Sequence, residues 1–160
     1  LCVSDIPADK FDDDKDCVYL DGISDPGNLG TILRSCLATG FDNVVLAGGV
    51  DCYNPKVVRS AMSAVCKLNI CSLSEEITLE KIKEKGYTII CADMSGKNIF
   101  DCRFGDAKKC LIIGSEANGV SYSALMNADI TVSLPMGRIE YLNAAVCASV
   151  MMYELKYNKK

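Results

Sequence analysis

The chain of 160 residues contains no histidine and no tryptophan. Without histidine, the commonest general base in enzymes is missing, so any proton transfer must depend on other side chains. Ten cysteines are present, but no two of them form a Cys-x-x-Cys pair. Zinc sites need clustered cysteine or histidine ligands, so we expect no metal site. Scattered cysteines within apolar runs are typical of small buried side chains in a reduced, cytosolic protein.

Long hydrophobic runs are also missing. The longest apolar stretch, residues 142–150, is far shorter than the roughly 20 residues that a membrane-spanning helix needs. The amino end does not have the basic region followed by an apolar core that marks a secretory signal peptide. We therefore expect a cytoplasmic protein that makes no contact with a membrane.

The chain has little excess charge, and that charge is unevenly distributed. The net charge is −4, and residues 1–16 carry all of it, because they hold six aspartates and two lysines. We expect 1–16 to be a flexible acidic lead-in from a region further upstream, and 17–160 to form one domain. A neutral domain has little non-specific affinity for nucleic acid, so an RNA substrate would need additional binding from elsewhere.

Short apolar segments alternate with helical patterns along the chain. Such an order predicts an α/β fold, a parallel sheet flanked by helices on both faces. The last helical stretch is apolar or small on nearly every side, so we expect it to pack against the sheet and against a second subunit. The expected strands are 17–20, 43–47, 67–71, 87–91, 110–113 and 130–133, and the expected helices are 28–39, 55–65, 75–85, 121–126 and 142–157.

The first segment with possible chemistry is Asp25-Pro26-Gly27-Asn28, which turns into the helix at 28–39. Asparagine is a good N-cap, and capping alone can explain Asn28. Arg34 lies beside the apolar stripe of this helix and has no structural role visible in the sequence. It is either a solvated surface residue or an arginine that binds a phosphate through two hydrogen bonds.

The second segment is Ile113-Gly114-Ser115-Glu116, with Gly119 closing the loop. Glycine at the end of a strand lets a ligand approach the backbone, and Glu116 would then stand at the crevice where open α/β sheets bind ligands. A plain turn also explains the pattern. The spacing matches neither a dinucleotide fingerprint nor a P-loop, which disfavours dinucleotides and nucleoside triphosphates.

The third segment is Leu134-Pro135-Met136 followed by Leu142-Asn143. Asn143 is polar at the start of an apolar helix, so it either caps that helix or faces a polar ligand. Met136 and Leu142 can frame an apolar slot for an adenine ring, or they can belong to the core.

In this order, the three segments resemble the motifs of the SpoU family of RNA ribose 2′-O-methyltransferases, in the SPOUT superfamily. Residues 54–59, Asn-Pro-Lys-Val-Val-Arg, also resemble the family's intervening region, and the resemblance covers about 17–157. It implies an α/β-knot fold, with a deep trefoil knot near the carboxyl end. It also implies S-adenosylmethionine as cofactor, structured rRNA or tRNA as substrate, and a homodimer.

The resemblance also implies site residues. The cofactor would contact Gly114, Ser115, Glu116, Leu134, Met136, Leu142 and Asn143. The catalytic set would be Asn28, Arg34, Glu116 and Asn143. The resemblance gives Arg34 a part in activating the 2′-hydroxyl. Because arginine stays protonated, we favour a role in positioning the phosphate, which leaves the acceptor of the hydroxyl proton open.

Two features depart from the family pattern. Tyr141 stands where a small hydroxylic residue usually precedes Leu-Asn, and the loop 135–142 is one residue shorter. Two other readings therefore remain. One is a base methyltransferase of the same fold, against which the pairing of Asn28 and Arg34 argues. The other is an inactive RNA-binding or dimerisation module, with Tyr141 as the lesion.

Overall fold

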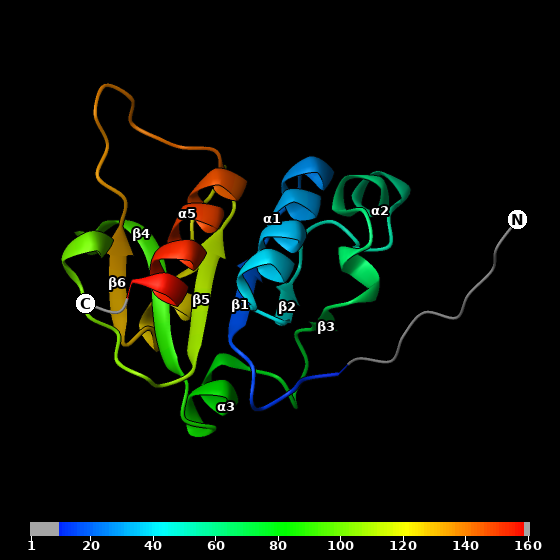
Figure 1. Cartoon of the computed structure of the whole chain (residues 1–160), viewed down its shortest axis with the longest axis horizontal. Helices are drawn as coiled ribbons and strands as arrows, with labels where there is room; N and C mark the ends of the chain where they lie inside the picture. Colours follow the sequence, from blue (N-terminus) through cyan, green and yellow to red (C-terminus); the bar gives the residue numbers. More distant parts are fainter. Residues whose placement is uncertain (1–9, 159–160) are drawn as a thin grey trace, which may run out of the picture.

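Six strands form a single sheet in the order β3-β2-β1-β5-β4-β6 in the computed structural model, which describes residues 10–158 (Figure 1). All five pairings between neighbouring strands are parallel, so the carboxyl ends of all six strands lie at one edge. The strands are β1 (Cys17–Asp21), β2 (Asn43–Ala47), β3 (Asn69–Ser72), β4 (Thr88–Asn98), β5 (Lys109–Gly114) and β6 (Ile130–Ser133).

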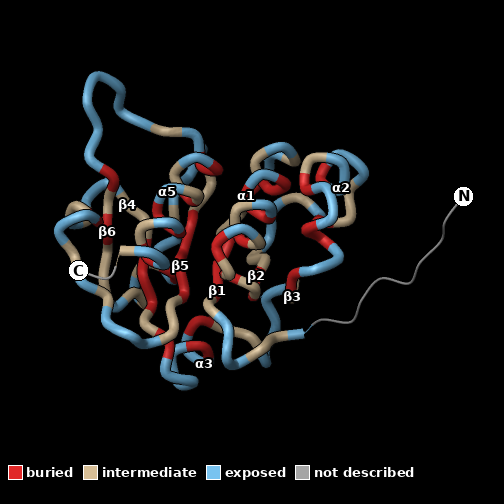
Figure 2. Tube along the Cα trace, viewed as in Figure 1, coloured by how far each residue is buried: buried red, intermediate tan, exposed pale blue. Residues whose placement is uncertain are grey.

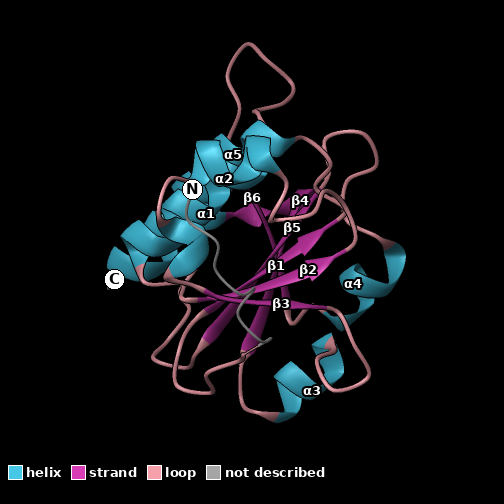
Figure 3. Ribbon diagram, turned by 90° about the vertical axis from the view of Figure 1, so that its right-hand side faces the viewer, coloured by secondary structure: helices cyan, strands magenta, loops and turns pink. Residues whose placement is uncertain are grey.

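Helices cover both faces of this sheet. Figure 3 shows α1, α2 and α5 on one face and α3 and α4 on the other. The sheet flanked by helices is therefore confirmed, while the trefoil knot stays a prediction. The helices are α1 (Pro26–Thr39), α2 (Pro55–Ala61), α3 (Leu79–Glu84), α4 (Tyr122–Asn127) and α5 (Ala144–Tyr157), with 3-10 turns η1 (Ala64–Cys66) and η2 (Ile99–Asp101).

The central strands β1 and β5 are apolar along most of their length because both of their faces are buried (Figure 2). In β1, Val18 and Leu20 belong to the core beneath α1 and α5, whereas Cys17 and Tyr19 face the other core, beneath α3 and α4. No disulfide joins any two of the nine cysteines that the structure describes, and six of the nine are buried. This confirms the expected role of most cysteines as core residues, and burial raises the pKa of Cys91 to about 12.

Three predicted elements differ from the observed ones by more than two residues at one end. The helix expected at 55–65 stops at Ala61, because Met62 adopts a positive φ of 56° and breaks it before η1. The helix expected at 75–85 begins only at Leu79, where the Thr78 side chain caps it. The strand expected at 87–91 runs on to Asn98 through an irregular stretch.

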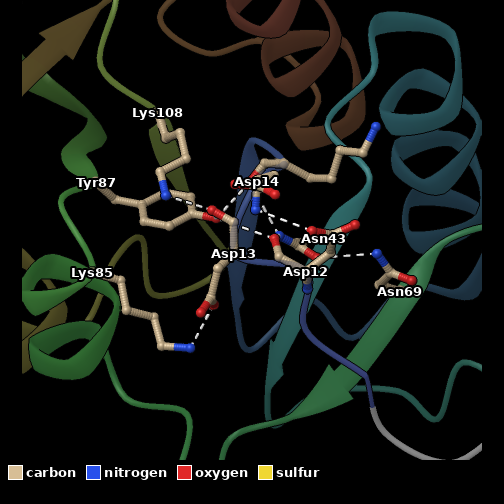
Figure 4. Close-up of polar contacts among 9 residues, drawn as sticks. Asp12, Asp13, Asp14, Asn43, Asn69, Lys85, Tyr87 and Lys108 are labelled. Atoms are coloured by element: carbon tan, nitrogen blue, oxygen red, sulfur yellow. Dashed lines mark hydrogen bonds and ion pairs between the residues drawn. The ribbon is translucent and has the colours of Figure 1, made fainter.

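Residues 10–16 pack beneath the amino edge of the sheet (Figure 4). The side-chain amide of Asn43 donates to the carbonyls of Asp12 and Lys15, at 2.7 and 3.1 Å. The Tyr87 hydroxyl donates to the same Lys15 carbonyl at 2.6 Å, and Asp16 forms an ion pair with Lys156 at 2.9 Å. This part of the expected flexible lead-in is therefore held in place, and residues 1–9 lie outside the described part.

Within residues 10–158, no helix is long and apolar enough to cross a membrane. The same residues contain no group of three or more histidine, cysteine, aspartate or glutamate side chains arranged to hold a metal ion.

Candidate active site

The candidate site lies where the sheet topology reverses. β1 is the first strand of the chain, yet it lies between β2 and β5. Asp21 at the end of β1 is paired with Gly114 at the end of β5, so the segments that follow these two strands start side by side. Open α/β sheets bind ligands in the crevice at such a point, outside the carboxyl ends of the strands.

Asn28 contributes its side chain to this crevice because another residue caps the helix. The N-cap of α1 is Asp25, whose Oδ2 accepts from the backbone amide of Asn28 at 2.8 Å. The interpretation of Asn28 as the cap is therefore wrong. Its side chain is instead bonded on both sides, donating from Nδ2 to Oε1 of Glu116 and accepting at Oδ1 from Nδ2 of Asn143 at 2.9 Å.

Asn143 fills both of the roles that the sequence left open. Its Oδ1 caps α5 by accepting from the amides of Ala145 and Val146, at 3.0 and 3.3 Å. Its Nδ2 is then free to donate to Asn28. Because a carboxylate only accepts, the donors of this chain of bonds point from Asn143 through Asn28 to Glu116. Three segments far apart in the sequence thus meet in one polar network.

Glu116 is presented on a tight loop after β5. The backbone groups of Ser115 and Gly119 exchange two hydrogen bonds, at 3.2 and 2.8 Å, and Gly119 adopts a φ of +66°. A side chain at Gly114 would place its Cβ 2.2 Å from the carbonyl carbon of Gly119. Glycine at 114 is therefore needed for the close approach of the chain to itself, and this loop holds the exposed Glu116 beside Asn28.

Arg34 lies further along α1 and is exposed. It makes no hydrogen bond or ion pair with any residue between 10 and 158. Arg34 follows Gly30 by one helical turn, and α2 packs closely enough on Gly30 that a Cβ there would lie 1.9 Å from Oγ of Ser60. The guanidinium is therefore available to a ligand, although no hydrogen bond joins Arg34 to Asn28, Glu116 or Asn143.

Two adjacent cavities open beside the polar network. The larger, of about 720 Å³, is lined by the predicted residues Gly114, Ser115, Glu116 and Leu142. The other, of about 420 Å³, is lined by the predicted Leu134 and Met136. Asn143 lines neither cavity and reaches the site through its bond to Asn28.

Sequence reasoning missed the residues that both cavities share. They are Ala92, Asp93, Met94 and Cys147. Between Ala92 and Lys97 the pairing of β4 with β6 shifts its register, so 93–96 leave the ladder, and 93–95 line the cavities. The small and polar residues that follow the apolar run at 87–91 were the sequence feature that could have indicated this part of the cavity wall. Burial raises the pKa of Cys147 above its ordinary value, which keeps the thiol protonated at neutral pH.

The cavities carry negative charge only. The charged residues that line them are Asp93, Glu116 and Glu140, and neither lysine nor arginine is among them. Asp93 accepts from the amide and the hydroxyl of Ser95, at 2.9 and 2.6 Å, which fixes its carboxylate at the cavity wall. Such a lining favours a ligand with positive charge and hydrogen-bond donors.

Fold and site together define an α/β protein that binds a ligand at the carboxyl edge of a parallel sheet. The sequence profile of the SpoU rRNA Methylase family matches residues 16–153. The chain belongs to this family.

Similar proteins have been named and solved. The 23S rRNA (guanosine(2553)-2'-O)-methyltransferase RlmP of Bacillus subtilis (strain 168) is 32% identical over 96% of this chain. The SpoU methyltransferase AviRb of Streptomyces viridochromogenes, in complex with AdoMet, is 30% identical over 96% of this chain, with a TM-score of 0.85. An AdoMet-bound rRNA methyltransferase from Sinorhizobium meliloti is 26% identical over 91% of this chain, with a TM-score of 0.84.

The chain spans only part of these proteins. It covers 63% of the Bacillus protein, 66% of the AviRb chain and 57% of the Sinorhizobium chain.

Proposed function

We propose that this chain is the catalytic domain of an enzyme that methylates a ribose 2′-hydroxyl in structured rRNA or tRNA, with S-adenosylmethionine as the donor. The observation that carries the proposal is the chain of hydrogen bonds from Asn143 through Asn28 to Glu116, beside two adjacent cavities. The named relatives support the reaction, because RlmP is a 2'-O-methyltransferase and AviRb was solved with AdoMet.

The cavities suit such a donor in size, lining and charge. Cavities of a few hundred Å³ hold ligands of this size, and side chains such as Met94, Leu134 and Leu142 offer apolar surface to an adenine ring. When bound, the donor supplies an electrophilic methyl group on a positively charged sulfonium. The carboxylates of Asp93 and Glu116 complement that charge and the hydroxyls and amino group of the donor.

The chain's own residues would then orient the acceptor. Glu116 is exposed, and its second oxygen can accept from a ribose hydroxyl while the first holds Asn28. The Arg34 guanidinium, available in this structure, binds the phosphate next to the reacting ribose. Together these contacts would orient the 2′-hydroxyl toward the bound donor. That orientation is a large part of catalysis for a weak nucleophile. The 2′-oxygen gains the methyl group and loses its proton, and S-adenosylhomocysteine is released.

We also propose that the protein is a homodimer through the outer face of α5. Four exposed apolar side chains follow one another there at spacings of four, three and four residues: Val146, Val150, Tyr153 and Tyr157, at 46%, 38%, 50% and 62% exposure. That spacing gathers them on one face of a helix, and such a contiguous apolar face is typical of a protein interface. The knotted topology and a cytoplasmic location are part of the same proposal, the latter supported by the lack of a disulfide among the described cysteines.

Calorimetry and alkaline hydrolysis test the function in two steps. Titration with S-adenosylmethionine should release or absorb heat with saturation at one donor per chain, and no binding would leave an inactive module as the better reading. RNA labelled by the full-length protein with a tritiated methyl donor should retain its label in alkali-resistant dinucleotides, because a methylated 2′-oxygen cannot attack the neighbouring phosphate. Label in ordinary mononucleotides would instead indicate base methylation.

A further inference from the structure

The loop between β6 and α5 stands out from the carboxyl edge of the sheet (Figure 1). Every residue from 135 to 141 is exposed. Three of them are nevertheless apolar or aromatic: Met136, Ile139 and Tyr141, with exposed fractions of 37%, 57% and 67%. An exposed group of this kind next to a ligand cavity marks a surface that a ligand covers.

Tyr141 is the member of this loop closest to the site. It lines the larger cavity together with Leu142, and the next residue along, Asn143, donates to Asn28. Most of its surface nevertheless remains exposed, and its hydroxyl makes no hydrogen bond with any described residue. The side chain therefore has one part at the wall of the cavity and an open aromatic surface outside it.

We propose that the Tyr141 ring stacks on an unpaired base of the RNA, at or next to the nucleotide whose ribose is methylated. A ribose held at the mouth of the cavity, beside Glu116 and Asn28, carries its base within reach of this ring. Proteins that recognise RNA commonly splay out unpaired bases and stack them on aromatic side chains. This inference rests on the proposed function and adds a residue that positions the substrate.

The chemistry of the loop favours RNA over the other possible occupants. Arg138 lies three residues before Tyr141 and is also exposed, so the loop combines an aromatic ring with a cation, as in single-strand binding sites. The proposed dimer face on α5 already accounts for a second copy.

The lack of tryptophan allows a direct test. Tyr141→Trp introduces a single tryptophan whose emission reports stacking, and Tyr122→Trp is the matched control. Tyr122 is 78% exposed on α4 and lines neither cavity. A pool of random single-stranded RNA oligonucleotides, added with S-adenosylhomocysteine, should quench the emission of Trp at 141 and leave that at 122 nearly unchanged. No excess quenching at 141 would overturn the proposal.

Kinetics with the full-length protein on transcribed ribosomal RNA give a second readout. Tyr141→Leu should raise KM for RNA by about tenfold and leave the Kd for S-adenosylmethionine unchanged, because a stacking surface is lost. Tyr141→Phe should behave like the wild type. An equal rise in KM for RNA in both variants would assign substrate positioning to the hydroxyl. A change confined to the Kd for S-adenosylmethionine would show that the ring contacts the donor. Either result contradicts stacking on a base. Failure of the proposed function is different, since the unaltered protein would then bind no donor or would methylate a base in place of a ribose.

Discussion

Each edge of the sheet holds a pair of asparagine side chains joined by a hydrogen bond. At the amino edge, Asn69 donates to Asn43 at 3.3 Å, and at the carboxyl edge Asn143 donates to Asn28 at 2.9 Å. The same chemistry therefore occurs at both ends of the strands. The two pairs differ in how many of their polar atoms have hydrogen-bond partners and in how exposed their surroundings are.

At the amino edge, every polar atom of the central amide is satisfied (Figure 4). Asn43 is 0% exposed; its Nδ2 donates to two carbonyls of residues 10–16, and its Oδ1 accepts from the amide of Asp12 at 3.0 Å as well as from Asn69. At the carboxyl edge, Glu116 and Asn143 are exposed beside a cavity. A saturated buried network stabilises the fold, whereas an open one can receive a ligand.

The largest effect is expected at Arg34. Arg34→Ala should lower kcat by about a hundredfold or more, because the acceptor phosphate is no longer held in place. Donor affinity and the free energy of unfolding should stay near their wild-type values, since Arg34 is exposed and makes no hydrogen bond or ion pair with any described residue. The measurements are methyl transfer to RNA, donor calorimetry and urea unfolding. Retained turnover would remove Arg34 from the site.

Matched alanine variants at the two edges should separate activity from stability. Asn28→Ala should lower kcat at least about tenfold by releasing Glu116 and Asn143. It should cost little free energy of unfolding, because the site is partly exposed. Asn43→Ala should lower the free energy of unfolding by about 2–3 kcal/mol, because the four hydrogen bonds of a fully buried amide are lost. Donor affinity should persist where that variant is folded. The opposite pattern in the two variants would contradict the contrast between the edges.

A glycine pair tests the geometry of the carboxyl edge. Gly114→Ala should weaken donor binding by about tenfold or more, because its Cβ would lie 2.2 Å from the backbone of Gly119 and displace the loop that carries Glu116. Gly137→Ala is the control, since nothing lies within 4 Å of its Cβ position. Calorimetry with S-adenosylmethionine compares the two. Equal affinity in both variants would show that the loop does not shape the donor site.

The smallest effect is expected at Asp129, at the amino edge. Desolvation opposes its charge, but the hydrogen bonds from Lys83 and from the backbone amide of Ile89 outweigh it and lower the pKa of Asp129 below 3.8. A carboxyl group whose pKa is lower in the folded protein than in the unfolded chain stabilises the fold at pH values above its unfolded pKa. That stabilisation is lost as the pH falls through the pKa of the folded state. Asp129→Asn should therefore cost under about 1 kcal/mol at pH 7, and less below pH 3.8. Urea unfolding at pH 7 and below pH 3.8 checks this prediction. An equal loss of stability at both pH values would rule out the charge of Asp129 as the source of the stabilisation.

The strands were predictable because each is buried on both faces and reads as an apolar run. The ends of the helices were less predictable. Met62 ends α2 through its positive φ, and the spacing of apolar residues does not reveal this backbone conformation. In the site, the residues at 28, 116 and 143 came from the family resemblance, but their bonding did not. That bonding depends on Asp25 acting as the N-cap of α1, and the cavity wall at 93–95 depends on a register shift between β4 and β6. Both are products of tertiary contacts.

One measurement bears most directly on the assignment of catalysis to the carboxyl edge. Ribosomal RNA incubated with the full-length protein and a donor carrying a deuterated methyl group can be digested to nucleosides and analysed by mass spectrometry. The expected result is a deuterated methyl group on the ribose of one nucleoside, present with the wild type and lost in Arg34→Ala. A deuterated methyl group on a base, or equal ribose labelling by both proteins, would contradict it.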